Sequence, residues 1–333
     1  MDSVDVAVAG AGMAGLAAAL AAAERGATVA VFEKSTRAGG NAAVSAGMLL
    51  GARDYEALRR YIPEGDPDLQ RMLCAEIFDA IDWLAAHDLP IGAPMAHGEF
   101  RVSRPMGLGA PANRAVFMEI LADRVVAAGG TIAYSSPVTG LKRNGGSLAI
   151  QSGGPTVEAR ALVIATGGFQ ANRELIARYI GADAAESLRI RSRPEATGDG
   201  LALALAQGAA TSRNMAAFYG HTMADCPLPI TMYQPLTPYF ARAGILLNRD
   251  GRRFVDETTT FIEEGNAQAA CHQPGGMFYL VFDRRMYDID RAPGGERTRT
   301  QAEDWLETAA RFGVPLWTAE TVDGLIAQLA EAG

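Results

Sequence analysis

The feature that most constrains the fold of this chain is a glycine-rich turn that joins a short apolar run to a helical stretch near the N-terminus. Residues 4–9 predict a buried parallel strand, and residues 16–25 predict a helix. The turn between them reads Gly10-Ala11-Gly12-Met13-Ala14-Gly15. In this pattern the first glycine allows the tight bend, the second lets a pyrophosphate approach the backbone, and the third lets the helix lie close on the strand. The pattern therefore predicts a βαβ unit whose helix N-terminus faces a phosphate.

An acidic residue after the next predicted strand supports the same interpretation. Gly26 ends the helix, residues 28–32 form a second apolar strand, and Glu33 follows it. Glu33 stands 23 residues after Gly10, close to the spacing of about 20 at which a carboxylate accepts the ribose hydroxyls of a dinucleotide. A solvated acid after a strand is the alternative. Taken as one unit, the segment predicts dinucleotide binding, and both nicotinamide and flavin cofactors fit it.

The composition excludes several classes of protein. The 333 residues, 49% hydrophobic and 20% charged, suffice for one large domain or two ordinary ones and are too apolar for a disordered chain. Lys and Arg number 30 against 38 Asp and Glu, so no positive field attracts a phosphate backbone and we predict no nucleic-acid partner. The apolar N-terminal run ends at Glu24-Arg25, short of the about 20 residues of a bilayer span, so we predict neither a signal peptide nor a membrane span.

The three cysteines, Cys74, Cys226 and Cys271, lie far apart in the sequence and form no C-x-x-C pair. This spacing indicates neither a disulfide framework nor a zinc site, and we predict no metal site. Free thiols are typical of a reducing compartment, so the predicted location is the cytoplasm.

Four further motifs follow the glycine turn in order. A loop of small residues over 38–47 comes after Glu33-Lys34. It is either a flexible surface loop or a loop that runs closely along a long, buried cofactor. Downstream come Ala165-Thr166-Gly167-Gly168-Phe169 with Asn172, then Thr197-Gly198-Asp199-Gly200, then Gly251-Arg252-Arg253-Phe254-Val255-Asp256-Glu257. Together these motifs resemble the FAD-dependent oxidoreductase family of fumarate reductase and succinate dehydrogenase flavoproteins, whose relatives include ketosteroid dehydrogenases and tricarballylate dehydrogenase. The resemblance covers most of the chain.

The resemblance implies FAD as the cofactor, and it favours flavin over nicotinamide. It also implies non-covalent attachment, because Ala42, Ala43 and Val44 stand in the early loop where the respiratory complexes carry a flavin-linked histidine. The expected FAD contacts are Gly10, Gly12, Met13, Ala14, Gly15, Glu33, Lys34, Gly39, Gly40, Asn41, Ser45, Ala46, Gly47, Val138, Ala165, Thr166, Gly167, Gly168 and Asp199.

The activity that the resemblance implies is addition or removal of hydrogen across a carbon–carbon bond next to a carboxylate or carbonyl of a small substrate. The catalytic candidates are His221, Arg253 and Glu257, although a structural histidine and a surface ion pair are the alternatives. Phe261 stands where fumarate reductases carry their proton-donating arginine, and Thr222 replaces a proline after the histidine. These departures leave a ketosteroid dehydrogenase-like enzyme as an alternative, with Tyr219, Tyr233 and Tyr239 as acid or base groups.

The expected fold is α/β, a doubly wound parallel sheet forming a Rossmann-like FAD-binding domain with an inserted β-meander, plus a smaller α+β capping domain. We place the FAD-binding domain at residues 1–217 and the substrate or capping domain at 218–333. We expect helices over 67–87, 113–128 and from about 322, a helix opened by Thr197-Gly198-Asp199-Gly200, and strands over 131–134, 138–143, 147–151, 156–159 and 161–165.

One segment of the family pattern has no match. Family members normally return from the second domain to the first with a glycine-rich stretch, and none follows the helix that starts near residue 322. We therefore expect a truncated chain, a lost closing segment, or a partner that supplies it. This keeps a flavin-binding protein without autonomous catalysis as an alternative, and it allows for an electron-transfer partner.

Overall fold

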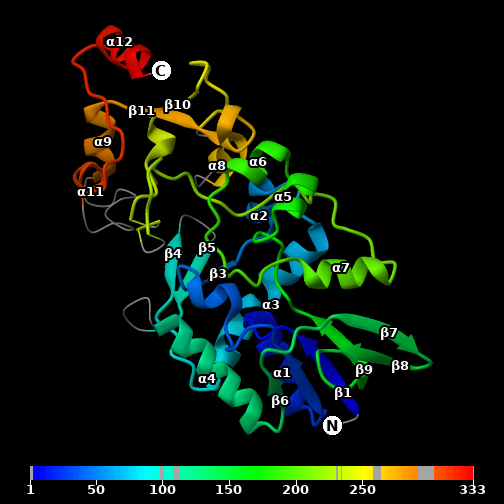
Figure 1. Cartoon of the computed structure of the whole chain (residues 1–333). Helices are drawn as coiled ribbons and strands as arrows, with labels where there is room; N and C mark the ends of the chain where they lie inside the picture. The colour runs from blue at the N-terminus through cyan, green and yellow to red at the C-terminus, as the bar shows by residue number, and fades with distance from the viewer. Residues whose placement is uncertain are drawn as a thin grey trace. The chain divides into compact units, whose positions relative to one another are not determined.

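The computed structural model describes residues 3–97, 101–107, 113–229, 232–233, 235–257, 264–291 and 304–332. The chain divides into two compact units, which are treated separately (Figure 1). Unit 1 comprises residues 1–172 and 192–211, and unit 2 comprises residues 173–191 and 212–333. The boundary predicted after residue 217 stays a prediction, and the excursion over 173–191 into unit 2 has no signal in the sequence.

The larger sheet of unit 1 has six strands in the order β6-β2-β1-β9-β8-β7. Strands β6, β2, β1 and β9 run parallel, whereas β9, β8 and β7 form an antiparallel meander. The strands are β1 (Ser3–Ala9), β2 (Val29–Phe32), β6 (Thr131–Ala133), β7 (Gly140–Asn144), β8 (Ser147–Gln151) and β9 (Val157–Ile164). The predicted α/β fold, with a parallel sheet and an inserted meander, is confirmed.

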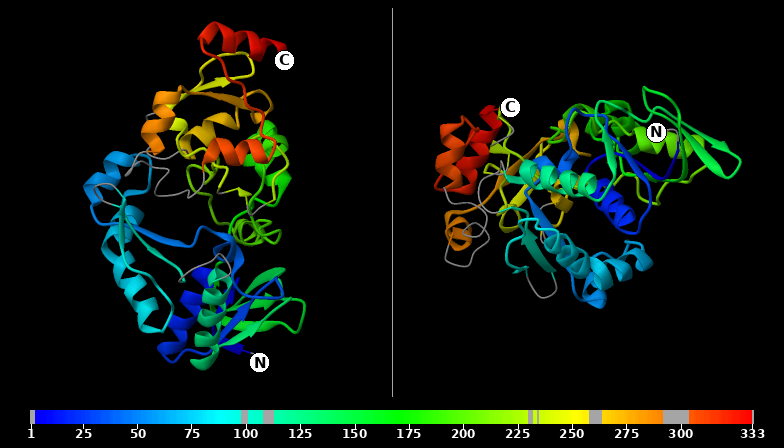
Figure 2. Two further views of the ribbon diagram at one scale, coloured as in Figure 1. Left: turned by 90° about the vertical axis from the view of Figure 1, so that its left-hand side faces the viewer. Right: turned by 90° about the horizontal axis from the view of Figure 1, so that it is seen from below.

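Helices α1 (Met13–Glu24) and α4 (Asn113–Ala127) cover one face of this sheet (Figures 1 and 2). Leu16 and Leu20 of α1 meet Phe117 and Leu121 of α4 in the main core cluster, and all four are at most 1% exposed. Helix α1 begins at Met13, three residues before its predicted start, and Gly12 is its N-cap residue. The helix predicted over 113–128 is confirmed as α4.

Two strand predictions need correction. Segments 156–159 and 161–165, predicted as separate strands, form the single strand β9, because β1 pairs with both parts of it. The strand predicted over 131–134 is β6, which lies beside β2 in the parallel sheet and not in the meander. Its position follows from α4, which acts as a crossover helix and returns the chain to the open edge of β2.

A separate antiparallel sheet in unit 1 has the strand order β3-β5-β4. Its strands are β3 (Met48–Ala52), β4 (Met95–His97) and β5 (Arg101–Pro105), and helices α2 (Tyr55–Tyr61) and α3 (Pro67–Ala86) accompany them. Helix α3 confirms the prediction over 67–87. Its start is fixed by Asp66, whose carboxylate accepts the N–H groups of Asp68 and Leu69. None of the helices in the described ranges combines the length and the apolar composition that a bilayer crossing requires.

Unit 2 is built around aromatic side chains. The ring of Phe240 meets Phe282, Tyr287 and Trp305 edge to face, with centroids 5.0 to 5.4 Å apart. Strands β10 (Ile245–Asn248) and β11 (Phe278–Val281) pair in antiparallel fashion. The helices of unit 2 are α5 (Arg173–Tyr179), α6 (Ala182–Ser187), α8 (Glu264–Ala270), α9 (Arg284–Arg291), α11 (Trp305–Arg311) and α12 (Val322–Ala332), with 3-10 turns at Ala241–Ala243 and Pro274–Gly276. Helix α12 confirms the last predicted helix.

Candidate functional site

The three glycines of the first turn occupy different surroundings. Gly10 has a φ of +104°, and a Cβ there would lie 2.4 Å from the Ala165 carbonyl oxygen. A Cβ on Gly15 would lie 1.9 Å from the Gly10 carbonyl oxygen, so helix and strand touch at this point. By contrast, a Cβ on Gly12 would meet nothing within 4 Å. The fold itself therefore requires Gly10 and Gly15, whereas Gly12 leaves open space beside the helix N-terminus.

That helix N-terminus is available to an anion. Gly12 is the N-cap residue of α1, and no side chain caps the helix there. The N–H groups of Met13 and Ala14 therefore have no partner within the helix, and the positive end of the helix dipole lies at the same place. Together these groups form the type of site that binds a phosphate.

Glu33 ties the end of β2 to the glycine turn. Its carboxylate accepts the N–H of Ala11 at 2.6 Å and the N–H of Ser35 at 2.7 Å, and the residue is only 7% exposed. An ionised carboxylate has further lone pairs after these two bonds. Its predicted role as acceptor for a ribose stays a prediction, and the structure adds a role in shaping the turn.

The small-residue loop over 38–47 runs beside the glycine turn. Gly39, at a φ of +125°, donates its N–H to the Ala11 carbonyl at 2.9 Å, and Gly39 forms an isolated bridge with Gly12. The 3-10 turn η1 (Gly40–Val44) follows. The side-chain oxygen of Asn41 accepts the N–H of Arg193 at 2.8 Å. The loop is therefore anchored at several points, which does not fit the flexible-loop alternative.

Two distant motifs meet next to this loop. The Lys34 ammonium lies 2.9 Å from an Asp199 carboxylate oxygen and donates to the Thr197 hydroxyl at 2.6 Å. Asp199 opens helix α7 (Asp199–Ala206), as predicted. The Thr166 hydroxyl oxygen accepts the N–H of Gly200 at 3.1 Å. Segments that lie more than 150 residues apart in the sequence are thus brought together around the first turn.

Sequence reasoning missed three residues of this region: Ser192, Arg193 and Glu195. Arg193 donates from its guanidinium to the Ser35 hydroxyl and to Glu195, both at 3.2 Å, and its N–H holds Asn41. The Ser192 hydroxyl also donates to the Asn41 side chain, at 3.1 Å. Because these residues belong to no recognisable motif, only the three-dimensional contacts identify them.

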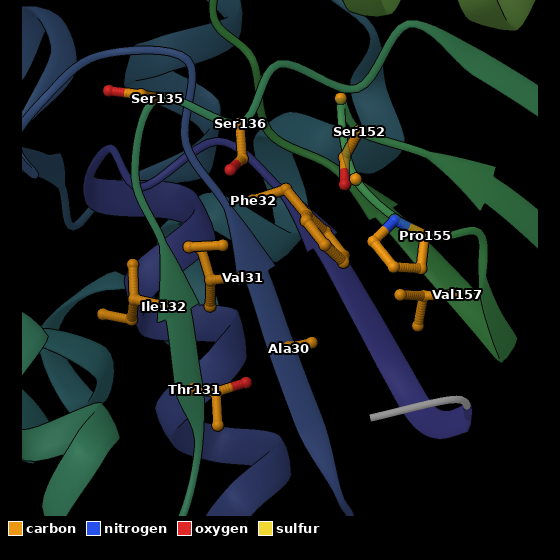
Figure 3. A pocket seen from close by; sticks show the side chains of 13 residues that line it. Ala30, Val31, Phe32, Thr131, Ile132, Ser135, Ser136, Ser152, Pro155 and Val157 are labelled. Carbon is orange, nitrogen blue, oxygen red and sulfur yellow. The ribbon is translucent and has the colours of Figure 1, made fainter.

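Val138 lies in the chain between β6 and β7. Its side chain is buried in a second core cluster with Phe32 and Ile150, so any contact with a cofactor would involve its backbone. A cavity of about 410 Å³ adjoins this cluster, between β2, β6 and the loop that precedes β9 (Figure 3). Figure 3 shows Phe32, Ser136 and Ser152 around it. The cavity flanks β2, the strand that Glu33 follows.

The candidates Arg253 and Glu257 of unit 2 contact each other. Glu257 is 1% exposed and accepts Nε–H of Arg253 at 3.0 Å and the N–H of Leu246 at 2.7 Å. Burial acts to raise the pKa of Glu257, but the hydrogen bonds from Arg253 and Leu246 outweigh it and hold the pKa below its usual range. The same ion pair raises the pKa of Arg253. This geometry holds the start of β10 in place.

His221 is engaged with two tyrosines of unit 2. Its Nε2 lies 3.0 Å from the Tyr219 hydroxyl, and its ring meets that of Tyr239 edge to face at 5.8 Å. Tyr219 is 78% exposed, which is unusual for such a large ring. Among the described residues, no hydrogen bond or ring contact joins His221 to Arg253 or Glu257. The predicted Phe261 substitution lies outside the described residues.

Comparisons with known proteins extend these observations. The family described as "FAD binding domain" matches residues 5–312. Fumarate reductase (cytochrome) of Shewanella frigidimarina is 29% identical over 308 residues, which cover 85% of this chain and 52% of that protein. Urocanate reductase of Eggerthella lenta is 27% identical over 317 residues, which cover 84% of this chain and 50% of that protein. The chain thus spans about half the length of these curated relatives.

A solved structure supports the fold. The 3-ketosteroid Δ4-(5α)-dehydrogenase from Rhodococcus jostii RHA1, in complex with 4-androstene-3,17-dione, superposes with a TM-score of 0.72 over 99% of this chain and 74% of that chain. The two sequences are 21% identical, so this likeness concerns the fold alone.

The family match includes the glycine turn, the loop over 38–47 and the motifs around residues 166 and 198. These are the segments that the structure brings together in unit 1. The family match therefore indicates a flavin cofactor rather than a nicotinamide. The chain belongs to the FAD-binding domain family.

Proposed function

We propose that this protein is an FAD-dependent oxidoreductase that adds or removes hydrogen across a carbon–carbon bond next to a carboxylate or carbonyl. The observation that carries the proposal is the assembly, in unit 1, of four segments that are far apart in the sequence. The named substrates of two relatives support the reaction type, because fumarate and urocanate both carry a double bond conjugated with a carboxylate. The proposal includes both reduction and oxidation of the substrate.

The residues of unit 1 fit FAD. The open space beside Gly12, which a Cβ would fill, has the position that a pyrophosphate requires. The N–H groups of Met13 and Ala14 would hold the phosphates, and Glu33 would accept the ribose hydroxyls. The loop over 38–47, anchored through Asn41, would run along the rest of the cofactor. Attachment without a covalent bond is part of the proposal.

FAD supplies hydride transfer when it is bound, so the chain itself has to hold the substrate and move a proton. His221 and Tyr219 are the groups of unit 2 that we assign to this task. Each can hydrogen-bond a carboxylate or carbonyl oxygen, and their 3.0 Å contact lets a proton pass between them. The Arg253–Glu257 pair serves this site less well, because the Glu257 carboxylate is buried and already accepts hydrogen bonds from Arg253 and Leu246.

A flavin-binding protein without autonomous turnover is the second candidate. One observation favours it: among the described residues, His221 bonds to Tyr219 and Arg253 bonds to Glu257, and no hydrogen bond joins the two pairs into one catalytic cluster. In that case the flavin would bind as proposed, but substrates would not exchange electrons with it.

The location and the partners belong to the same proposal. The structure leaves Cys74, Cys226 and Cys271 as free thiols, which supports a reducing compartment such as the cytoplasm. A small carboxylate or carbonyl compound would be the substrate. An electron-transfer partner would supply or remove the electrons.

A flavin reduction assay separates the two candidates. The purified protein should show the flavin absorption band near about 450 nm, and anaerobic reduction with dithionite should bleach it. Addition of fumarate or urocanate to the reduced protein should restore the band, or a 3-ketosteroid saturated at the C4–C5 bond should bleach the oxidised protein. A coloured protein that responds to none of these compounds supports the second candidate, whereas a colourless protein that no added FAD restores contradicts both.

A further inference from the structure

Two irregular segments of unit 2 lie side by side around His221. The ring of His221 contacts that of Tyr239, with the centroids 5.8 Å apart, and the Thr237 hydroxyl oxygen lies 3.7 Å from the Met223 sulfur. These two contacts join rising residue numbers in one segment to falling numbers in the other, so the segments run in opposite directions. Their side chains therefore form one continuous surface.

The side of the first segment that faces outward is aromatic and apolar. Burial alternates along it: Thr222 and Ala224 are buried, whereas Tyr219, His221 and Met223 are more exposed. Because alternate residues of an extended chain point to opposite sides, the second group shares one side. Ligand-binding surfaces have this composition, with mostly aromatic and apolar side chains and a few polar groups that fix the orientation of the ligand.

The ring of Tyr219 is exposed and yet held in place. The residue is 78% exposed, but its hydroxyl lies 3.0 Å from Nε2 of His221, and the two rings meet edge to face with centroids 5.0 Å apart. A large ring gains stabilisation when a ligand covers it, and a ring that is already oriented loses little conformational entropy on binding. Tyr219 is therefore preorganised to receive a flat apolar group.

The electrostatics of the two tyrosine rings discriminate between substrates. The face of an aromatic ring carries negative charge density and its edge carries positive charge density, so a second aromatic ring packs well against it and a carboxylate is repelled from its face. One carboxylate of a substrate can hydrogen-bond to His221 and to the Tyr219 hydroxyl. A second carboxylate, such as that of fumarate, would then lie against ring faces, whereas an aromatic ring in its place would be stabilised.

We propose that unit 2 selects a 3-arylacrylate, an unsaturated acid with an aromatic ring on its double bond, and that Tyr219 and Tyr239 determine this specificity. The inference rests on the proposed function and names its substrate class. In the reducing direction a hydride from reduced FAD adds to one carbon of the double bond, and a proton from the His221–Tyr219 pair adds to the other. The π bond breaks, two C–H bonds form, and the substrate gains the two electrons that the cofactor loses. The product is a 3-arylpropanoate.

The first test measures binding without turnover. The FAD-loaded protein is kept reduced with dithionite under anaerobic conditions, so that two saturated acids, 3-phenylpropanoate and 3-cyclohexylpropanoate, bind without reacting. The two acids have the same carbon count and the same charge, but only the first has a flat aromatic ring. We expect equilibrium dialysis to show that 3-phenylpropanoate binds about fivefold more tightly, because paired aromatic rings attract each other beyond the area that they bury.

Variants assign this preference to the ring of Tyr239. Tyr239→Leu should lower the preference to about twofold or less, whereas Tyr239→Phe, which retains the ring, should keep it. Tyr279→Leu is the matched control, because Tyr279 belongs to a different aromatic pair of unit 2, with Trp317 at 5.9 Å. This control should keep the full preference. The FAD content of each variant is measured in parallel.

Turnover separates this inference from the proposed function. We expect 3-phenylacrylate to restore the flavin band of the reduced protein with a kcat/KM about tenfold or more above that of fumarate. Equal binding of the two saturated acids, a preference that survives Tyr239→Leu, or faster turnover of fumarate would overturn the inference and leave the proposed function standing. If neither 3-phenylacrylate nor fumarate restored the band, the proposed function would fail, and the inference with it.

Discussion

The candidate cofactor site of unit 1 and the candidate catalytic residues of unit 2 are built in different ways. In unit 1 each contact of the glycine turn involves main-chain atoms: the Gly39 N–H donates to the Ala11 carbonyl, the Ala11 N–H donates to the Glu33 carboxylate, and a Cβ on Gly15 would strike the Gly10 carbonyl oxygen. In unit 2 the contacts join side chains, as in the Arg253–Glu257 pair. A site made of backbone and glycine has few alternative geometries, whereas a site made of long side chains depends on everything packed around it.

The first way to sharpen this comparison is to change the two glycines that differ most in their surroundings. Gly12→Val should leave the fold intact, because a Cβ there meets nothing within 4 Å and the φ of −80° suits any residue. Its side chain would fill the space of the pyrophosphate, so we expect FAD affinity to fall by about 100-fold or more. The measurement is flavin content after purification together with titration of the apoprotein with FAD.

Gly15→Val provides the contrasting variant. Its Cβ would lie 1.9 Å from the Gly10 carbonyl oxygen, so we expect it to lower the free energy of unfolding by about 3 kcal/mol or to prevent folding. Normal flavin retention in Gly12→Val would show that the phosphates bind elsewhere. Equal losses of stability in both variants would contradict the distinction between the two glycines.

The same contrast explains what the sequence alone can predict. The glycine turn and Glu33 follow from a local pattern, because the strand, the turn and the helix are contiguous in the chain. The contact between Asn41 and Arg193 joins residues that are 152 positions apart, and no rule of spacing indicates it. Likewise, β6 was predicted as part of the meander because short strands look alike, and only its pairing with β2 decides its sheet.

The candidate residues of unit 2 were harder to assign for the same reason. The spacing of Arg253 and Glu257 is compatible with a catalytic pair or with an exposed ion pair. The structure fits neither alternative fully, because Glu257 is buried while the Arg253 side chain is 53% exposed. His221 could be proposed by its place in a family motif, but its hydrogen bond to Tyr219 required the folded loop.

The largest effect expected in unit 2 concerns His221. If His221 and Tyr219 hold the substrate and move its proton, His221→Ala should lower kcat/KM by about 100-fold without changing flavin content. Tyr219→Phe keeps the ring and removes the hydroxyl that contacts Nε2, so it should reproduce a large part of the loss. The measurement is steady-state kinetics over a range of pH, with FAD titration as the control. Unchanged kinetics in both variants would assign the pair to loop structure.

Glu257→Gln tests whether the Arg253–Glu257 pair is structural. Glutamine keeps an acceptor for the N–H of Leu246 but loses the charge that pairs with Arg253. Because Arg253 is half exposed, we expect the free energy of unfolding to fall by only about 1–2 kcal/mol. Urea unfolding of the FAD-loaded protein measures it.

The same pair makes the free energy of unfolding depend on pH. The pKa of Glu257 is lowered on folding, so its contribution to stability is present above the ordinary carboxyl pKa and is lost as the pH falls through the lowered value. Glu257→Gln should lack this acid-dependent loss. A variant of normal stability with greatly reduced turnover would instead support the catalytic role predicted from the sequence.

Lys34→Met tests the same comparison from the opposite direction, because the Lys34 side chain joins distant segments of unit 1. The ammonium joins Asp199 and Thr197 to the end of β2. The pair is about one-third exposed, so we expect a loss of stability below about 1 kcal/mol and a decrease in FAD affinity of about fivefold. Arg160→Met, which removes a pair with Asp5 whose cation is far more exposed, is the matched control and should change neither quantity. An affinity loss as large as that of Gly12→Val would show that the side chains of unit 1 matter as much as its backbone.

The smallest effect concerns a side-chain cluster of unit 1 that lies outside the cofactor site. His87 faces the Trp83 carbonyl through Nδ1 at 2.8 Å and the Glu24 carboxylate through Nε2 at 2.6 Å. Both partners only accept hydrogen bonds, so the doubly protonated ring fits best. The hydrogen bond to Trp83, helped by Glu24, outweighs burial and raises the pKa of His87. The stabilisation is therefore fully present below about pH 6.5 and is lost as the pH rises through the raised value.

We expect His87→Gln to lower Tm by about 2 °C at pH 6 and to have no effect at pH 9, with FAD affinity unchanged at both. Equal Tm differences at the two pH values would show that the ring is neutral in the fold, and a change in FAD affinity would mean that the cofactor site depends on side chains well beyond its backbone frame.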